Sequence, residues 1–288
     1  MQLKQAEIVV FSPGGSTRKV GKVIASEIES YGIETNLIDL TGKPLAEDEK
    51  IAQNYKNPPN FLVIGSPVYV GKVAEPIQVF LNSLPLAASN CICIPFCTYG
   101  GVIVGYTIRD MVDLLKEKGY LIPRAMEVLS KHCLIFDSVQ DKFGQKPGDQ
   151  ELSLVKDCVS NFIHQIKKTG NWEEIGTLSA TEVYDGKQDI KVFYDSPSWM
   201  IPEPRFQDHK CRSDGACVET CSIASIELDE NKKAYRAHGC VKCYSCMKAC
   251  PTKAWNAPIV SMFPKFHEKQ AKSQDDENLT RIYLPDLE

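Results

Sequence analysis

Seven cysteines between residues 211 and 250 have a spacing that could hold a polynuclear metal centre. Four of them, Cys240, Cys243, Cys246 and Cys250, follow the pattern C-x2-C-x2-C-x3-C and precede Pro251. Three thiolates this close can wrap three irons of one iron–sulfur cubane, while the fourth thiolate points toward a neighbouring cluster. A structural zinc site more often shows C-x2-C pairs separated by a longer loop. The spacing therefore favours iron–sulfur chemistry over zinc.

The residues before this run repeat its spacing with one substitution. Cys211, Asp214, Cys217 and Cys221 occupy the four positions, so a carboxylate stands where the second thiolate is expected. A carboxylate is a harder and weaker ligand for Fe(II) than a thiolate, which would make this the labile corner of the site. Two interpretations stay open: Asp214 binds an iron, or it is an ordinary loop residue and that iron is absent.

The two halves together resemble dicluster bacterial-type ferredoxins, including those that carry Asp in this position. The resemblance implies either a [4Fe–4S] cluster with carboxylate ligation or a [3Fe–4S] cluster in the first half. It also implies that the fourth cysteines cross over. Cluster I would use Cys211, Asp214, Cys217 and Cys250, and cluster II would use Cys240, Cys243, Cys246 and Cys221. Ser222 departs from the Pro that usually follows the fourth cysteine, and we expect a small effect.

The first 170 residues must supply the larger framework. Apolar runs predict strands at residues 6–11, 34–40, 60–65, 91–96 and 121–128, and apolar spacing predicts helices between them, the last at 151–168. Strands that alternate with helices indicate a doubly wound parallel α/β sheet, whose ligand lies outside the carboxyl ends of the strands. Three unusual loops, at 12–17, 66–71 and 98–101, fall at those ends, so one pocket can collect all three.

The first of these loops, SPGGST, follows a strand and precedes a helix. Backbone N–H groups in such a turn can stabilise a phosphate at the helix N-terminus. This part of the chain resembles flavodoxins, and the whole layout resembles the flavodoxin–ferredoxin fusion proteins of the EFR1 family. The resemblance implies that FMN is bound, with its phosphate at Ser12, Gly14, Gly15, Ser16 and Thr17. The flavin ring would lie between Pro67, Val68, Tyr69 and Gly71 on one side and Thr98, Tyr99, Gly100 and Gly101 on the other. Gly14 replaces the usual Thr, and Pro13 cannot donate a hydrogen bond.

Composition limits the remaining possibilities. The formal net charge of −4 and the absence of a basic stripe argue against a nucleic-acid binder. The first residues do not form a signal peptide, and no apolar run approaches the length of a membrane span. Cluster cysteines need reduced thiols, which predicts a cytoplasmic protein. Cys91, Cys93, Cys97, Cys133 and Cys158 lie among apolar neighbours and are expected in the core.

We therefore predict four segments: a flavodoxin-like FMN domain (1–170), a connecting segment (171–205), a small α+β dicluster ferredoxin domain (206–257) and a C-terminal tail (258–288). The connecting segment could contain a hairpin at 190–194, and Trp199 and Met200 could anchor it.

The function expected from this organisation is electron transfer between a protein donor and a protein acceptor, and a homodimer is compatible with the sequence. One alternative is an FMN-dependent reductase of a small molecule, such as a quinone or a corrinoid-type cofactor. Another is an iron or oxygen sensor at the Asp214 corner.

Overall fold

The computed structural model describes residues 3–55, 59–87, 91–101, 103–133, 142–170, 173–183, 202–257, 268 and 279–285. The first part contains β1 (Gln5–Val10), α1 (Ser16–Ser30), β2 (Glu34–Asp39), α2 (Leu45–Gln53), β3 (Phe61–Tyr69), β4 (Lys72–Val73), α3 (Glu75–Ser83), β5 (Ile92–Tyr99), α4 (Thr107–Glu117), β6 (Ala125–Leu129) and α5 (Asp149–Thr169). The second part contains β7 (Arg205–Phe206), α7 (Ala216–Glu219), β8 (Ile226–Leu228), β9 (Ala234–Arg236), α8 (Ser245–Ala249), β10 (Trp255–Asn256) and β11 (Arg281–Tyr283).

The main sheet has the strand order β2-β1-β3-β5-β6, and neighbouring strands in this series are parallel. This is the flavodoxin-like doubly wound order, with the order reversing next to β1. Two short strands extend it: β4 forms a hairpin with β3, and β11 pairs antiparallel with β6 at the edge. The predicted flavodoxin-like α/β fold is confirmed.

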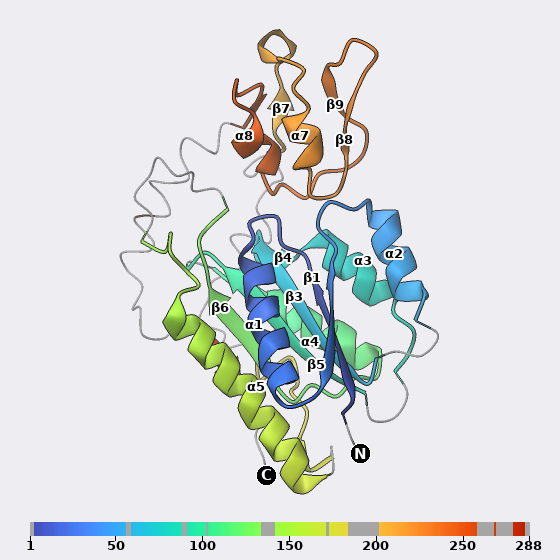
Figure 1. Cartoon of the computed structure of the whole chain (residues 1–288), viewed down its shortest axis with the longest axis vertical. Coiled ribbons are helices and arrows are strands. Elements are labelled where there is room, and N and C mark those ends of the chain that lie inside the picture. Colours follow the sequence, from blue (N-terminus) through green and yellow to red (C-terminus); the bar gives the residue numbers. More distant parts are fainter. Residues whose placement is uncertain are drawn as a thin grey trace.

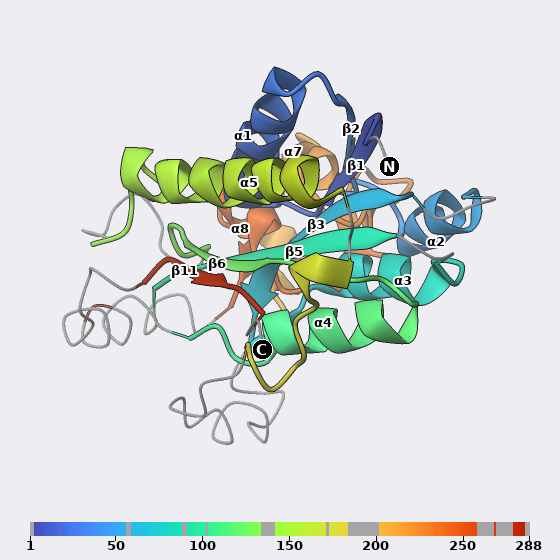
Figure 2. The same cartoon turned by 90° about the horizontal axis from the view of Figure 1, so that it is seen from below.

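Helices cover both faces of this sheet, as Figure 2 shows from one end. α1 and α5 pack on one face, and α3 and α4 pack on the other with α2 beside α3. Side chains on β1 alternate accordingly: Ile8 and Val10 face the first pair of helices, whereas Val9 faces the second group. Burial on both faces explains why the strands read as continuous apolar runs. Within the described ranges, no helix has the length and apolar character needed to span a membrane.

Residues 205–256 form a small α+β unit. β7 pairs with β10 and β8 pairs with β9, and Trp255 and Ile226 contribute to a core of their own. Figure 1 shows this unit (orange) beyond the carboxyl ends of the strands, over the start of α1. We call it the cysteine module.

Several details differ from the sequence-based expectation. β3 continues through the predicted loop as far as Tyr69, and α2 was not predicted. The described end of the tail joins the main sheet as β11. The hairpin expected at 190–194, together with Trp199 and Met200, lies outside the described residues.

One buried charge is unusual in this framework. The Asp48 side chain on α2 is fully buried, and neither carboxylate oxygen has a hydrogen-bond partner among the described residues. Burial raises its pKa to about 7; Lys43 opposes the rise and Glu47 adds to it. The folded chain therefore holds a proton at Asp48 that the unfolded chain has already released between the ordinary carboxyl pKa and about 7.

The buried proton on Asp48 makes folding less favourable as the pH rises from the ordinary carboxyl pKa to about 7. We expect Asp48→Asn to raise the melting temperature more at about pH 8 than at about pH 5, with its effect on the unfolding free energy about 3 kcal/mol larger at the higher pH. Anaerobic thermal unfolding of both proteins, followed by circular dichroism, measures it. The same change in melting temperature at both pH values would contradict a protonated, buried Asp48.

Candidate functional site

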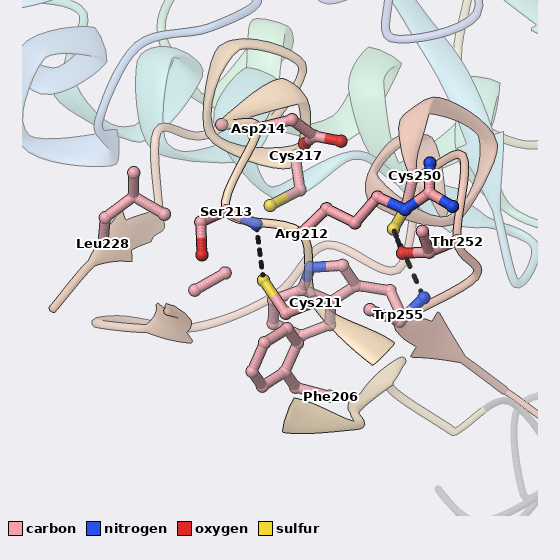
Figure 3. A pocket seen from close by; sticks show the side chains of 13 residues that line it. Phe206, Cys211, Arg212, Ser213, Asp214, Cys217, Leu228, Cys250, Thr252 and Trp255 are labelled. Carbon is pink, nitrogen blue, oxygen red and sulfur yellow. Dashed lines mark hydrogen bonds between the residues drawn. The ribbon is translucent and has the colours of Figure 1, made fainter. Parts of the chain in front are cut away.

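The eight residues predicted as iron ligands separate into two cavities of the cysteine module. The first cavity is lined by Cys211, Asp214, Cys217 and Cys250. The second is lined by Cys221, Cys240, Cys243 and Cys246. Cys221 and Cys250 thus each line the cavity of the opposite half, which is the crossed arrangement implied by the ferredoxin resemblance. Figure 3 shows the sulfur atoms of Cys211, Cys217 and Cys250 around one space.

The two halves of the module repeat each other in backbone geometry as well as in sequence. The amide of Ser213 donates to Cys211 Sγ at 3.3 Å, and the amide of Lys242 donates to Cys240 Sγ at 3.4 Å. Both donors have a left-handed backbone, at φ 60° and 57°. Such positive φ values are uncommon for residues other than glycine, and here they turn the amide toward sulfur.

The crossed cysteines are hydrogen-bonded in the same repeated way. The amide of Ser225 donates to Cys221 Sγ at 3.2 Å, and the amide of Ala254 donates to Cys250 Sγ at 3.3 Å. Burial would raise the pKa of the Cys250 thiol, but hydrogen bonds from Thr252 and nearby backbone amides lower it overall. Donors aimed at sulfur favour the thiolate, which is the form that binds iron.

The indole N–H of Trp255 also borders the first cavity. It is buried, no acceptor among the described residues meets it at full hydrogen-bond geometry, and it lies close enough to Cys217 to oppose the rise that burial causes in the pKa of that thiol. Figure 3 shows the Trp255 ring at the edge of the space that the three sulfur atoms surround. With three cysteines and Asp214 around the first cavity and four cysteines around the second, the donor sets fit an iron–sulfur cluster.

Within the described residues, no group of three or more His, Cys, Asp or Glu side chains is placed to hold a single metal ion. The cysteines of each cavity are spread around its wall. A cubane cluster offers a separate iron to each cysteine, so its ligands do not converge on one point.

Asp214 lines the first cavity, but its side chain is exposed. Its Oδ1 accepts a hydrogen bond from the amide of Ala216, at 3.1 Å, at the start of α7. The carboxylate therefore has a local structural role in addition to its place beside the cavity. Its assignment as an iron ligand stays a prediction.

The three predicted flavin loops meet at the carboxyl edge of the main sheet. Thr17 Oγ1 lies 2.8 Å from Thr98 Oγ1, which joins the first loop to the third. Pro67 is paired with Thr98 across β3 and β5, which joins the second loop to the third. The three loops therefore lie side by side at one edge of the sheet.

In the first loop, hydroxyl groups and amides have different roles. Ser12 Oγ accepts the amide of Arg18, and the Thr17 hydroxyl is buried against Thr98. Gly15, with φ 84°, is the N-cap residue that directly precedes the 15-residue helix α1. The first-turn amides of Ser16 and Thr17 have no partner within the helix, as at any helix N-terminus. These amides and the Ser16 hydroxyl form the part of the loop best suited to a phosphate.

The second loop is a tight hairpin. Val68 pairs with Val73 and Tyr69 with Lys72, so Val70 and Gly71 form the two-residue turn. Both have positive φ, at 56° and 70°. This conformation suits glycine but strains the β-branched Val70. Strain of this kind often accompanies a binding site, and it holds the preceding Tyr69 at the edge of the sheet.

The two predicted tyrosines have different environments. Tyr99 is buried, and its hydroxyl donates to the carbonyl of Leu279 in the tail, so it supports the sheet edge rather than the rim of a cleft. Burial raises the pKa of Tyr69 well above its usual value, and the nearby thiols of Cys133 and Cys243 add to the rise. Tyr69 thus lies between the loop region and the second cavity.

Residues that follow β6 also belong to this region, which the sequence did not indicate. A side chain at Gly100 would collide with His132, and one at Gly101 would collide with Phe143, so both rings pack on the third loop. Cys133 influences both Tyr69 and Tyr244, which places it near the boundary between the two parts of the chain. None of these residues belongs to a recognisable spacing pattern, because only the fold brings them here.

The cysteine module contacts the main domain through residues that line its second cavity. The amide of Gly42, after β2, donates to the carbonyl of Ser222 at 2.7 Å. Ile223 is buried in the same apolar cluster as the α3 and α4 side chains, and Val241 packs against that cluster. The second cavity is therefore the one nearest the loops.

Comparison with known proteins gives only distant likenesses. No family model matches the chain, and no curated protein matches it. Among solved structures, the Flv1 flavodiiron core from Synechocystis sp. PCC6803 is 19% identical over 58% of this chain and 37% of that chain, with a TM-score of 0.42. A flavodoxin from the domain Archaea is 19% identical over 57% of this chain and 99% of that chain, with a TM-score of 0.40. Flavodoxin 2 from Bacillus cereus is 14% identical over 56% of this chain and 99% of that chain, with a TM-score of 0.39. The chain thus spans little more than a third of the flavodiiron core.

Replacing Asp214 by Cys tests the altered corner of the first cavity. We expect Asp214→Cys to raise the iron content of the anaerobically reconstituted protein and to slow its loss of iron in air, because a thiolate holds that iron more tightly. Iron and sulfide are counted on the same sample, and bleaching is followed optically.

Asp208→Cys is a suitable control, because Asp208 is an exposed aspartate of the same module that does not line the cavity. If the iron content and oxygen tolerance of Asp214→Cys equal those of the wild type, residue 214 is not at a cluster.

Proposed function

We propose that the protein is an electron-transfer flavoprotein that binds FMN at the three loops and an iron–sulfur cluster in each cavity of the cysteine module. It exchanges electrons with protein partners. In this proposal the chain is a member of the flavodoxin–ferredoxin fusion family that its sequence resembles.

The observation that carries the proposal is the closeness of the loops and the second cavity. Ile223 lines the second cavity and is buried in the apolar cluster of the main domain. Val68 and Tyr69 of the second loop pack against the same cluster. Two groups bound at these places would be separated by little more than side chains.

Bound together, FMN and the clusters would supply the conversion between two-electron and one-electron transfer. The chain contributes position and environment. The α1 amides orient the phosphate, the apolar contact at Ile223 excludes water between the sites, and backbone amides stabilise thiolates in both cavities.

The arrangement also gives the two clusters different places in the route. The second cavity faces the main domain, whereas Arg212 and Asp214 at the first cavity are exposed. The first cavity is therefore the one suited to a protein partner, and the second is suited to exchange with the flavin.

An anaerobic reductive titration tests the proposal. Flavin and iron are counted on the purified, reconstituted chain, and absorbance is followed as reductant is added. We expect flavin and about eight irons or fewer per chain, with flavin and cluster bands bleaching in the same titration. A chain that binds clusters but no added FMN would refute the flavin part of the proposal, and a chain without clusters would refute the rest.

Ser16→Ala tests the phosphate position. We expect FMN to bind about tenfold more weakly, because a hydrogen bond to a charged phosphate is lost. Fluorescence titration of the apoprotein with FMN measures the dissociation constant. Thr17→Val is the matched variant, since the Thr17 hydroxyl is buried against Thr98. Equal losses in both variants would assign the effect to packing of the loop, and unchanged affinity in Ser16→Ala would place the phosphate elsewhere.

A further inference from the structure

The repeat in the cysteine module is broken beside Cys243. Ser222 Oγ lies 3.1 Å from Cys243 Sγ, and Ser245 Oγ lies 3.4 Å from the same sulfur. Both serines are buried, so water does not compete for these contacts. Cys243 thus has two hydroxyl groups against its sulfur in addition to the backbone of the module.

The ligand position that corresponds to Cys243 in the first cavity has no equivalent of these two hydroxyls. Cys211 and Cys240 begin the two halves, and counting from them places Pro251 opposite Ser222 and Ala216 opposite Ser245. Asp214 stands opposite Cys243. Neither Pro251 nor Ala216 has a side-chain donor. The repeat is therefore asymmetric at the one ligand position where the two halves also differ in ligand type.

The direction of these hydrogen bonds follows from the chemistry of the ligand. In this structure either atom can donate in the Ser222–Cys243 contact, whereas Cys243 Sγ is the donor to Ser245 Oγ. A cysteine bound to iron is a thiolate and has no proton, so the Ser222 hydroxyl then donates to the sulfur, and the Ser245 hydroxyl must reorient to do so. Donors to the sulfur stabilise the more negative, reduced state of an iron–sulfur cluster and so raise its reduction potential.

From this geometry we infer that Ser222 and Ser245 are positioning residues that raise the reduction potential of the cluster in the second cavity. This inference rests on the proposed function. In the first cavity one hydroxyl also lies against a sulfur, with Thr252 Oγ1 3.5 Å from Cys250 Sγ. The shorter contact at Ser222 makes the effect stronger in the cavity nearest the flavin loops. The serine that replaces the usual proline after Cys221 therefore has a larger role than its sequence position indicated.

Ser222 is also fixed from the side of the main domain. Its carbonyl accepts the amide of Gly42, and the next residue, Ile223, is buried in the main apolar cluster. The hydroxyl is thus held against Cys243 by the same contacts that dock the module. Replacing the side chain leaves the carbonyl and its hydrogen bond in place.

The test is a redox titration of the reconstituted full-length chain, monitored by electron paramagnetic resonance. We expect Ser222→Ala to decrease the ratio of reduced to oxidised second-cavity cluster about tenfold at a fixed solution potential, which is about 59 mV for one electron. Ser245→Ala should have a smaller effect because its contact is longer, and the double variant should have the largest. Ser222→Thr keeps a hydroxyl and should restore the wild-type potential.

Ser225→Ala is the matched control. Ser225 is a buried serine that lines the same cavity, but its hydroxyl accepts the amide of His238, and it is its backbone amide that donates to a cysteine. We expect its cluster potential to equal that of the wild type. Pulsed measurement of proton hyperfine couplings adds an independent readout, since Ser222→Ala should remove one exchangeable proton close to the cluster.

The outcomes separate the inference from the proposal beneath it. A wild-type chain that holds no cluster after reconstitution would overturn the proposed function and the inference with it. A chain with both clusters, in which Ser222→Ala leaves the potential and the exchangeable proton unchanged, would overturn the inference alone. An equal shift in Ser225→Ala would also overturn it, because the effect would then come from packing rather than from a hydrogen bond to sulfur.

Discussion

The junction between the main domain and the cysteine module is the contact on which the site depends. It consists of the Gly42–Ser222 hydrogen bond and the burial of Ile223 in the core of the main domain. A parallel sheet brings its loops to one edge, and this junction sets the second cavity on that edge. Without it, each part would keep its own binding features, but the two would not face each other.

The cysteine module combines symmetry with deliberate departures from it. Both halves use left-handed residues to turn amides toward sulfur, at Ser213 and Lys242. The departures are in the side chains that face each cavity. The indole N–H of Trp255 faces the first cavity, and the hydroxyl of Ser222 faces the second. Two cavities built on one backbone plan therefore differ in the electrostatic environment that they offer a bound cluster.

The main domain also holds features that reduce its stability. Asp48 is buried without a hydrogen-bond partner in the described chain, and Val70 adopts a backbone conformation that a β-branched residue rarely takes. Val70 lies in the hairpin at the sheet edge, where the turn positions Tyr69. Strain at such a place is compatible with a binding role. The surrounding sheet and the close approach of the Gly105 backbone to Gly71 hold the turn in one shape.

The sequence alone was sufficient for the fold class, and its cysteine spacing together with the ferredoxin resemblance predicted two sets of ligands. Continuous apolar strands with intervening helices specify a parallel sheet, because only strands buried on both faces have this composition. Cysteine spacing specifies which thiolates can reach a common centre, since it is a local property of a short chain segment. The crossed lining by Cys221 and Cys250 agrees with the resemblance on which it was expected.

Only the tertiary structure decided which cavity lies next to the flavin loops and which side chains surround them. Ser222 contacts Cys243, which lies 21 positions later in the sequence. Tyr99 donates a hydrogen bond to Leu279, which lies 180 positions later. His132 packs on Gly100 of the third loop, although His132 itself belongs to no motif. Contacts between residues so distant in sequence depend on how whole elements pack, and no local periodicity or spacing encodes that packing.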